Sequence, residues 1–133
     1  MTLSELTRLI SDAYGAEPEH LFVRHPGFAA FRRADNGKWF AVSMAGIPWR
    51  TLGEDREGRV DILNVKCDPI LVGSLRTRPG FCPAYHMNKS HWITILLDGS
   101  VEGEEIAALV EMSYGLTGAG QKGKRTEPTT KRM

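Results

Sequence analysis

The chain has 133 residues, of which 41% are hydrophobic, and its formal net charge is +1. This length predicts a single domain with its own hydrophobic core. No apolar run reaches the length of a membrane span and no segment resembles a secretory signal, so we expect a cytoplasmic protein without membrane contact.

The charges are unevenly distributed along the chain. Residues 20–97 carry eleven Lys or Arg against six Asp or Glu, and residues 118–133 carry five basic residues against one acidic residue. Residues 1–19 and 98–117 are acidic. This asymmetry suggests a surface that faces a polyanion. The alternative is that the charges simply cover solvated faces.

The first predicted element is a helix that begins after Thr2. Thr2 and Glu5 have the spacing of a capping box, and apolar residues then recur at helical intervals up to Ala13. Gly15 is expected to end this helix, because a glycine accepts the left-handed conformation that often follows a last turn.

A hairpin is predicted next, over residues 29–44. Asn36 and Gly37 suit a two-residue type I′ turn, with Asp35 opposite Lys38. Strict alternation then assigns side chains to the two faces of the sheet. One face takes Phe31, Phe40, Val42 and Met44, and the other takes Arg32, Trp39 and Ser43.

Residues 46–60 are rich in glycine and charge, and we expect a long loop there. A strand over residues 61–67 follows, with Leu63, Val65 and Cys67 on one face and Ile62, Asn64 and Lys66 on the other. Asp68 and Pro69 then predict the start of a second helix, because aspartate caps a helix and proline is favoured at its first position.

The remaining elements are a strand over residues 92–97 and a helix over about residues 104–117, with a short strand expected before them. Strands joined mainly by hairpin-like links favour an antiparallel sheet with helices on one face. We therefore expect an α+β fold of two layers in residues 1–117. Residues 118–133 are basic and almost free of apolar residues, which predicts a mobile tail.

Several short strings support this fold independently. They are Gly37-Lys38-Trp39-Phe40-Ala41, Lys66-Cys67-Asp68-Pro69, Pro79-Gly80-Phe81, Ser113-Tyr114 and the ten residues from Pro83 to Trp92, PAYHMNKSHW. Together they resemble the MmcQ/YjbR family over about residues 2–117. The resemblance implies the order α-β(3)-α-β(2)-α, with CyaY-like and secretion-chaperone-like relatives. It also implies DNA binding, by analogy with the double-wing domain of a phage transcription factor.

The string before the last strand allows four interpretations, namely a catalytic pocket, a metal site, a surface that binds phosphate and a fastened turn. Its family signature residues are Tyr85, His86, Asn88, Lys89, His91 and Trp92. Catalysis by the His86 and His91 pair lacks a nucleophile and a nearby carboxylate. A zinc site formed by these histidines with Cys67 and Cys82 lacks the usual ligand spacing. A turn fastened by Asn88 and the two histidines accounts for the string, with Lys89 placed to reach a ligand. We expect no catalytic residue, metal or cofactor.

The binding surface is expected on the sheet face opposite the helices. Basic side chains there would contact phosphate, and an exposed tryptophan would stack on a base. The candidate nucleic-acid-binding residues are Arg24, Arg32, Arg33, Lys38, Trp39, Lys66 and Lys89. The main alternative is a homodimer or protein interface on the same face, as in chaperone-like relatives. Small-molecule binding or an enzyme is less favoured.

The two cysteines, Cys67 and Cys82, are expected to be unpaired. One lies on a predicted strand and the other follows a predicted helix, so they could come close together. The inferred compartment is nevertheless reducing, which keeps thiols free.

Overall fold

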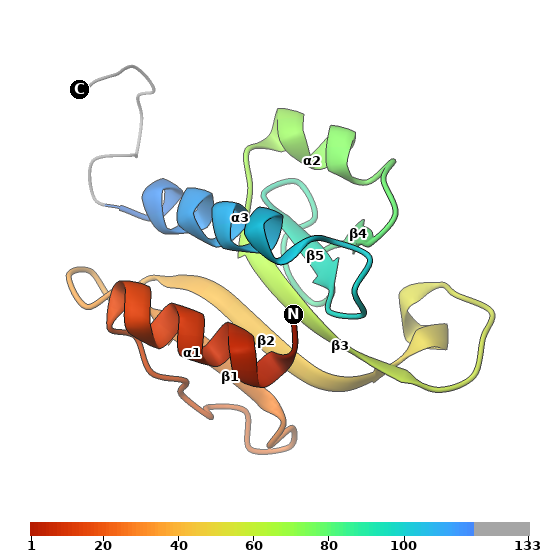
Figure 1. The fold of residues 1–133 in the computed structure, drawn as a ribbon, viewed down its shortest axis with the longest axis horizontal. Helices are drawn as coiled ribbons and strands as arrows, with labels where there is room; N and C mark the ends of the chain where they lie inside the picture. Colours follow the sequence, from red (N-terminus) through yellow and green to blue (C-terminus); the bar gives the residue numbers. More distant parts are fainter. Residues whose placement is uncertain (119–133) are drawn as a thin grey trace.

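A computed structural model of the chain describes residues 1–118, and residues 119–133, most of the predicted tail, lie outside this range. Figure 1 shows the arrangement of the helices and strands. In chain order they are α1 (Leu3–Tyr14), β1 (Phe28–Arg32), β2 (Trp39–Pro48), the 3-10 helix η1 (Trp49–Leu52), β3 (Arg59–Lys66), α2 (Pro69–Leu75), β4 (Phe81–Pro83), β5 (Trp92–Leu96) and α3 (Gly103–Leu116). Within residues 1–118, no helix is long and apolar enough to cross a membrane.

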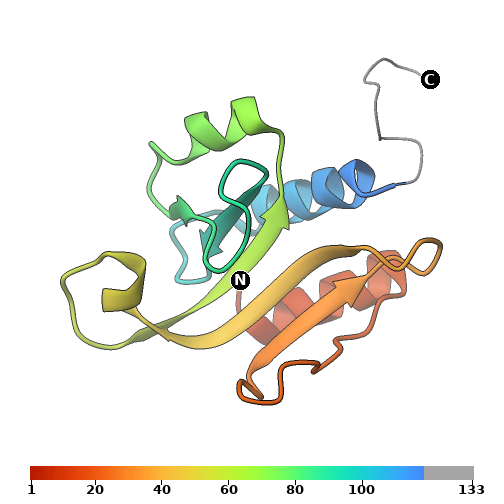
Figure 2. The ribbon, with the colours of Figure 1, turned by 180° about the vertical axis from the view of Figure 1, so that it is seen from behind.

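The strands form one antiparallel sheet in the order β1-β2-β3-β5-β4. The helices lie on one face of the sheet, as the two opposite views show (Figures 1 and 2). Buried residues of all three helices, such as Leu6, Val72 and Ile106, join Leu63 and Ile95 of the sheet in the main core. The predicted α+β class and two-layer arrangement are therefore confirmed.

Local signals account for how the helices begin and end. Thr2 and Glu5 form the expected capping box, and Gly15 takes a left-handed conformation with φ 67°. The Asp68 carboxylate accepts a hydrogen bond from the backbone N–H of Ile70, and Pro69 occupies the first turn of α2.

A bulge in β2 changes which side chains face the helices. Phe31 pairs with Ala41, whereas Arg32 pairs with Trp39, so Phe40 is an extra residue in β2. Phe40 and Ala41 both belong to the main core, whereas Val42 and Met44 belong to the core on the opposite face. The prediction that Val42 and Met44 share a face with Phe40 is wrong, because alternation holds only in a strand without a bulge.

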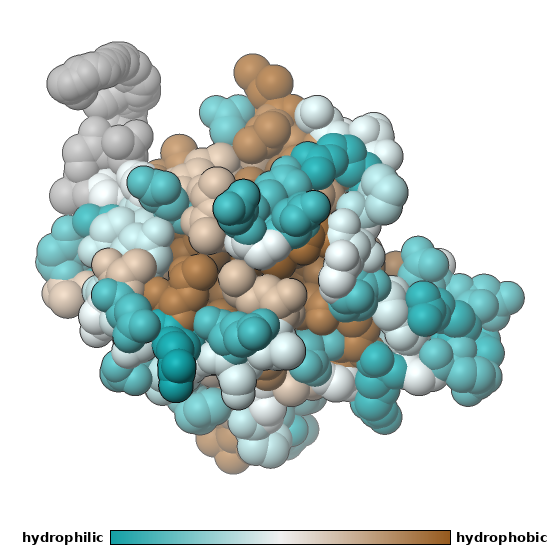
Figure 3. Space-filling model, viewed as in Figure 1, coloured by the Kyte–Doolittle hydropathy of each residue, from teal (hydrophilic) through white to brown (hydrophobic). Residues whose placement is uncertain are grey.

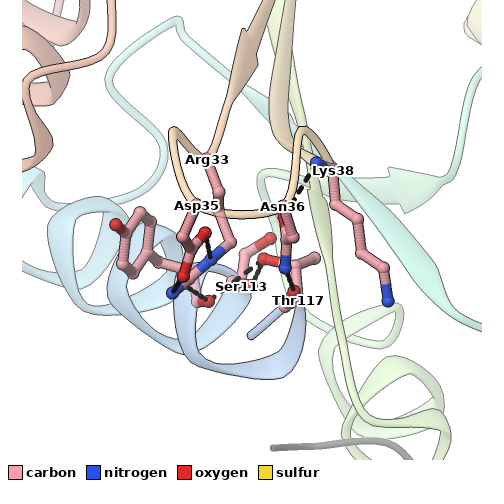
Figure 4. Close-up of polar contacts among 7 residues, drawn as sticks. Arg33, Asp35, Asn36, Lys38, Ser113 and Thr117 are labelled. Atoms are coloured by element: carbon pink, nitrogen blue, oxygen red, sulfur yellow. Dashed lines mark hydrogen bonds and ion pairs between the residues drawn. The ribbon is translucent and has the colours of Figure 1, made fainter. Parts of the chain in front are cut away.

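The hairpin tip is also different from the prediction. Arg33 and Lys38 close a four-residue loop, and within it only Gly37 has a positive φ, of 73°. A type I′ turn would need a positive φ at Asn36 as well. Instead, the Asn36 side chain accepts a bond from the Lys38 N–H and donates one to the Thr117 carbonyl of the α3 cap (Figure 4). A contact far away in the sequence thus selects the turn.

The segment expected as a loop over residues 46–60 is shorter than predicted, because both of its ends extend the sheet. β2 continues to Pro48 and β3 starts at Arg59, which leaves η1 and a short connection at the end of a projecting arm (Figure 1). Trp49 is buried there, and the Arg56 guanidinium lies 4.0 Å from its ring centroid. Seen from the helix side of the molecule, the end of this arm is hydrophilic (Figure 3). Hydrophobic residues gather instead between α1 and α3.

The second face of the sheet, opposite the helices, is apolar in its centre and partly covered. Phe28, Val42, Met44, Ile62 and Leu96 are buried there. The turn over residues 84–91, here called the signature turn, folds back over β3 and β5 (Figure 2). The expectation that this face is open is therefore wrong. The signature turn and the segment over residues 21–27 cover part of its apolar centre, which removes those side chains from water.

Candidate binding site on the second face of the sheet

A pocket of about 310 Å³ lies between the segment over residues 21–27 and the signature turn. Its floor consists of the buried side chains of Phe28, Val42 and Met44. Partly buried and exposed side chains form its walls and rim, namely Phe22, His25, Trp39, His86 and Met87. We call these eight residues the aromatic pocket. Its volume is at the lower end of the range for small-ligand sites.

The aromatic rings of the pocket are held in a defined arrangement. The Phe22 ring makes edge contacts with Phe28 and Trp39, with ring centroids 5.9 and 5.8 Å apart. The His25 ring stacks on Phe28 with centroids 4.6 Å apart. Such contacts stabilise each ring in its position. The pocket therefore offers preformed surfaces to a planar group with apolar faces.

The signature turn is fastened to the sheet through two buried polar side chains. The Asn64 amide donates to the Tyr85 carbonyl at 2.8 Å, and the Thr94 hydroxyl accepts from the Tyr85 N–H at 2.9 Å. The Thr94 hydroxyl also donates to the Asn64 carbonyl oxygen. Since both side chains are fully buried, these bonds fix the turn firmly.

The histidines do not hold the turn as the sequence suggested. His86 and His91 are exposed, and neither imidazole makes a hydrogen bond within residues 1–118. Asn88 behaves as expected, because its side chain accepts a bond from the Ser90 N–H. His91 contributes only its backbone carbonyl, which accepts from the Cys67 N–H at 2.8 Å.

His86 has an unusual backbone conformation. With φ 60°, it is the one non-glycine residue at positive φ in the described chain. This conformation is uncommon for a residue with a side chain, and histidine is among the types that tolerate it best. It places the imidazole at the rim of the aromatic pocket, next to the Tyr85 ring and tilted relative to it. Strain of this kind gathers at binding sites, which makes His86 a candidate ligand contact.

A row of basic and aromatic residues crosses one end of the second face. Arg32 pairs with Trp39 in the sheet, and Lys66 pairs with Trp92. All four side chains are partly exposed. We call them the end row. Trp39 belongs both to this row and to the aromatic pocket.

The predicted basic residues differ in their availability. Arg32 binds Glu19 through two nitrogens, and Arg33 binds Asp35 and donates to the Tyr114 carbonyl, with its guanidinium 3.8 Å from the Tyr114 ring centroid (Figure 4). Arg33 therefore fastens the hairpin tip to α3. The other four predicted cations, Arg24, Lys38, Lys66 and Lys89, make no ion pair within residues 1–118.

The cysteines are separated by the sheet. Cys67 lies in the core on the helix side and Cys82 in the core of the second face, and both thiols are free, as predicted. Burial raises the pKa of Cys67 to about 11 and also raises the pKa of Cys82. Among the described residues, no three His, Cys, Asp or Glu side chains are grouped as metal ligands.

Sequence reasoning missed six of the eight pocket residues. Phe22, His25 and Phe28 precede the predicted hairpin, and Met87 was not singled out as a binding residue. Val42 and Met44 were assigned to the opposite face of the sheet. The available signal was the run LFVRHPGF over residues 21–28, where aromatic residues surround a Pro-Gly pair. Large apolar residues in a short loop need a surface to cover, and here that surface is the second face.

Comparisons with known proteins agree with this fold. A family model described as YjbR matches residues 11–116. The uncharacterized protein YyaQ of Bacillus subtilis is 36% identical over 117 residues, which cover 88% of this chain and 98% of YyaQ. The uncharacterized protein YjbR of Escherichia coli is 40% identical over 53 residues, covering 39% of this chain and 45% of that protein.

Solved structures show the same similarity. A crystal structure of a Pseudomonas syringae protein has a TM-score of 0.85 and 44% identity, and the match covers 88% of this chain and 99% of that one. A crystal structure of a Deinococcus radiodurans protein has a TM-score of 0.68 and 25% identity, with 93% and 82% covered.

Proposed function

The chain belongs to the YjbR family, and from this premise we propose that it is a nucleic-acid-binding module that holds an unpaired base in the aromatic pocket. The ligand class is single-stranded DNA or RNA, whose bases are free to leave the stack. The proposal concerns binding rather than catalysis.

The observation that carries the proposal is the double position of Trp39. Its ring forms a wall of the aromatic pocket, and its backbone lies in the end row beside Arg32 and near Lys66. Proteins that bind single strands combine these two elements, namely aromatic rings that stack on bases and cations that follow the phosphates. The apolar floor beneath Trp39 suits the face of a base.

The net charge does not supply the attraction by itself. Residues 1–118 carry twelve Lys or Arg and fifteen Asp or Glu, so their formal charge is negative. Binding therefore depends on local cations, namely Lys38, Lys66 and Lys89, which make no ion pair within residues 1–118. The five basic residues in 119–133 add positive charge to the whole chain.

A protein-interaction role on the same face is the second candidate. The segment that forms one wall of the pocket exposes Val23 by 95% and Leu21 by 47%. Exposed apolar side chains at the rim of an apolar pocket are typical of protein-binding surfaces. A partner chain, or a second copy of this chain, would then insert a side chain into the pocket.

Fluorescence anisotropy with a labelled oligothymidylate tests the proposal. Wild-type protein should bind the single strand at about 50 mM salt and bind a matched duplex more weakly. Trp39→Ala should weaken single-strand binding by about 1–3 kcal/mol, the range for loss of a stacked base. The control is Val23→Ser, which alters the exposed rim but no pocket ring.

Two outcomes would decide between the candidates. Binding that is lost in Trp39→Ala and retained in Val23→Ser supports the nucleic-acid function. No binding at low salt, together with a wild-type dimer that Val23→Ser converts to a monomer, would overturn it in favour of the protein interface. Unchanged urea unfolding of both variants ensures that folding is not the cause.

A further inference from the structure

A second pocket, of about 230 Å³, lies beside the end row where the hairpin tip, the end of β3, the signature turn and the end of α3 at Leu116 and Gly118 meet. Three nitrogen-bearing side chains line it, those of Lys38, Lys66 and His91. Cys67, Asp68 and Pro69 form the adjoining wall. We call it the lysine pocket. These six residues all belong to the sequence strings that resemble the family.

Backbone contacts fix the main chain at all three residues. The Lys38 N–H donates to the Asn36 side chain, which is itself bound to the Thr117 carbonyl. The Lys66 N–H donates to the Ser113 hydroxyl at 2.8 Å, and that hydroxyl donates to the Phe40 carbonyl. The His91 carbonyl accepts from the Cys67 N–H. Three segments are thus held together, so the pocket is preformed.

The charges in the lysine pocket are not balanced within the described chain. Lys38 and Lys66 make no ion pair within residues 1–118. Asp68 is the one carboxylate of the lining, and it accepts the Ile70 N–H as the cap of α2. The buried Cys67 thiol stays neutral at physiological pH, because its pKa is about 11. The lining therefore carries two lysines and one carboxylate, which already accepts a backbone hydrogen bond.

We propose that the lysine pocket binds a phosphate group through Lys38, Lys66 and His91. Lysines supply point charges for phosphate, and an imidazole supplies an additional N–H donor. A compact tetrahedral oxyanion fits a cavity of 230 Å³ whose donors come from three sides. The proposal that this phosphate belongs to a nucleic-acid backbone rests on the proposed function. The proposal that the pocket binds phosphate does not.

The position of Lys38 relates this site to the aromatic pocket. Lys38 and Trp39 are consecutive, so their Cα atoms are about 3.8 Å apart, and one lines each pocket. The signature turn also contributes to both, with His86 at the aromatic pocket and His91 at the lysine pocket. A strand whose phosphate occupies the lysine pocket would have a neighbouring base close to Trp39.

The first test uses inorganic phosphate and the full chain. Amide and imidazole NMR signals of Lys38, Lys66 and His91 should shift with added phosphate, and sodium chloride of equal ionic strength should not shift them. Lys66→Gln should weaken phosphate binding about fivefold, the size of a partly exposed ion pair. Arg76→Gln, which removes an exposed cation at the other end of α2, should leave it unchanged.

The second test uses oligothymidylate with a normal backbone and with an uncharged methylphosphonate backbone. Weaker binding of the uncharged strand to wild type, and no such difference with Lys66→Gln, supports the site as a backbone phosphate site. Phosphate binding without any oligonucleotide binding would leave the lysine pocket valid and overturn the proposed function. No phosphate shifts at the three residues would overturn the lysine pocket, even if oligonucleotide binding persists through Trp39.

Discussion

Asn64 of β3 and Thr94 of β5 face each other as a fully buried polar pair in the apolar centre of the second face of the sheet. Through Tyr85 they hold the signature turn in place, so they control one wall of the aromatic pocket and the position of His86. Neither side chain reaches solvent. Their contribution is to position the turn.

Replacing Asn64 with Leu should lower the free energy of unfolding by about 2–3 kcal/mol. The substitution keeps the volume but leaves the Tyr85 carbonyl without its donor and the Thr94 hydroxyl without its acceptor. Urea unfolding measures this loss. Thr94→Val should act through the same network, so the double variant should be less destabilised than the sum of the two. Additive losses would show that the pair does not act as a unit.

Gly80→Ala should destabilise the protein by about 2 kcal/mol or more. Gly80 has φ 91°, and a Cβ there would lie 2.5 Å from Val101 Cγ2 and 2.9 Å from Ser100 Cβ. The matched control is Gly73→Ala in α2, where a Cβ would meet open space. Because alanine favours a helix, this control should gain about 0.5–1 kcal/mol. If Gly80→Ala and Gly73→Ala changed the thermal midpoint equally, the predicted steric clash at Gly80 would be contradicted.

The contact of Asp35 with Arg33 should make stability sensitive to acid. The hydrogen bond from Arg33 lowers the pKa of Asp35 below the ordinary value of an aspartate. A carboxyl with a lowered pKa in the folded state stabilises the fold above its unfolded pKa, and this contribution disappears as pH falls through the folded pKa. We expect stability to fall below about pH 4.

An NMR titration of the Asp35 carboxyl measures this effect. In Arg33→Gln its pKa should return toward the ordinary value, and the acid limb of stability should become less steep. Arg50→Gln, which removes a pair at the end of the β2–β3 arm, should leave the Asp35 titration unchanged. An unchanged Asp35 pKa in Arg33→Gln would show that another group lowers it.

Both thiols should be unreactive in the folded protein. Burial raises the pKa values of Cys67 and Cys82, so each thiol is less ionised at pH values near 8 than an exposed cysteine. A chromogenic disulfide reagent should therefore react slowly with native protein and rapidly with both residues after unfolding in guanidinium. Fast reaction of one thiol in the native state would place it at the surface.

The features predicted correctly from the sequence depend on short-range chemistry. The capping box at Thr2 and Glu5 and the proline start of α2 involve residues that are neighbours in the chain. The side chains of β3 also lie on the predicted faces, since they alternate between the two faces of the sheet from Arg59 to Lys66. The fold class follows from the order of such elements.

The features that were missed depend on residues far apart in the sequence. The extra residue at Phe40 shows only when β1 and β2 are paired, and the turn at Asn36 is selected by Thr117. The cover of the second face combines residues 21–27 with residues 84–91. Arg33 looked like a free cation because the acceptor of its longest-range bond, the Tyr114 carbonyl, is in α3. The aromatic pocket could not be assembled without these contacts.

The bulge at Phe40 makes β2 intolerant of a change in length. Removing Phe40 would leave Trp39 opposite Arg32 on the second face, because it takes out the one residue that breaks the alternation. It would also remove a fully buried ring and the carbonyl that accepts a hydrogen bond from Ser113, whose hydroxyl in turn accepts the Lys66 N–H beside the lysine pocket. Insertions and deletions in related chains should therefore gather in the hairpin tip and the β2–β3 arm, whereas the spacing between Lys38 and Val42 should stay constant.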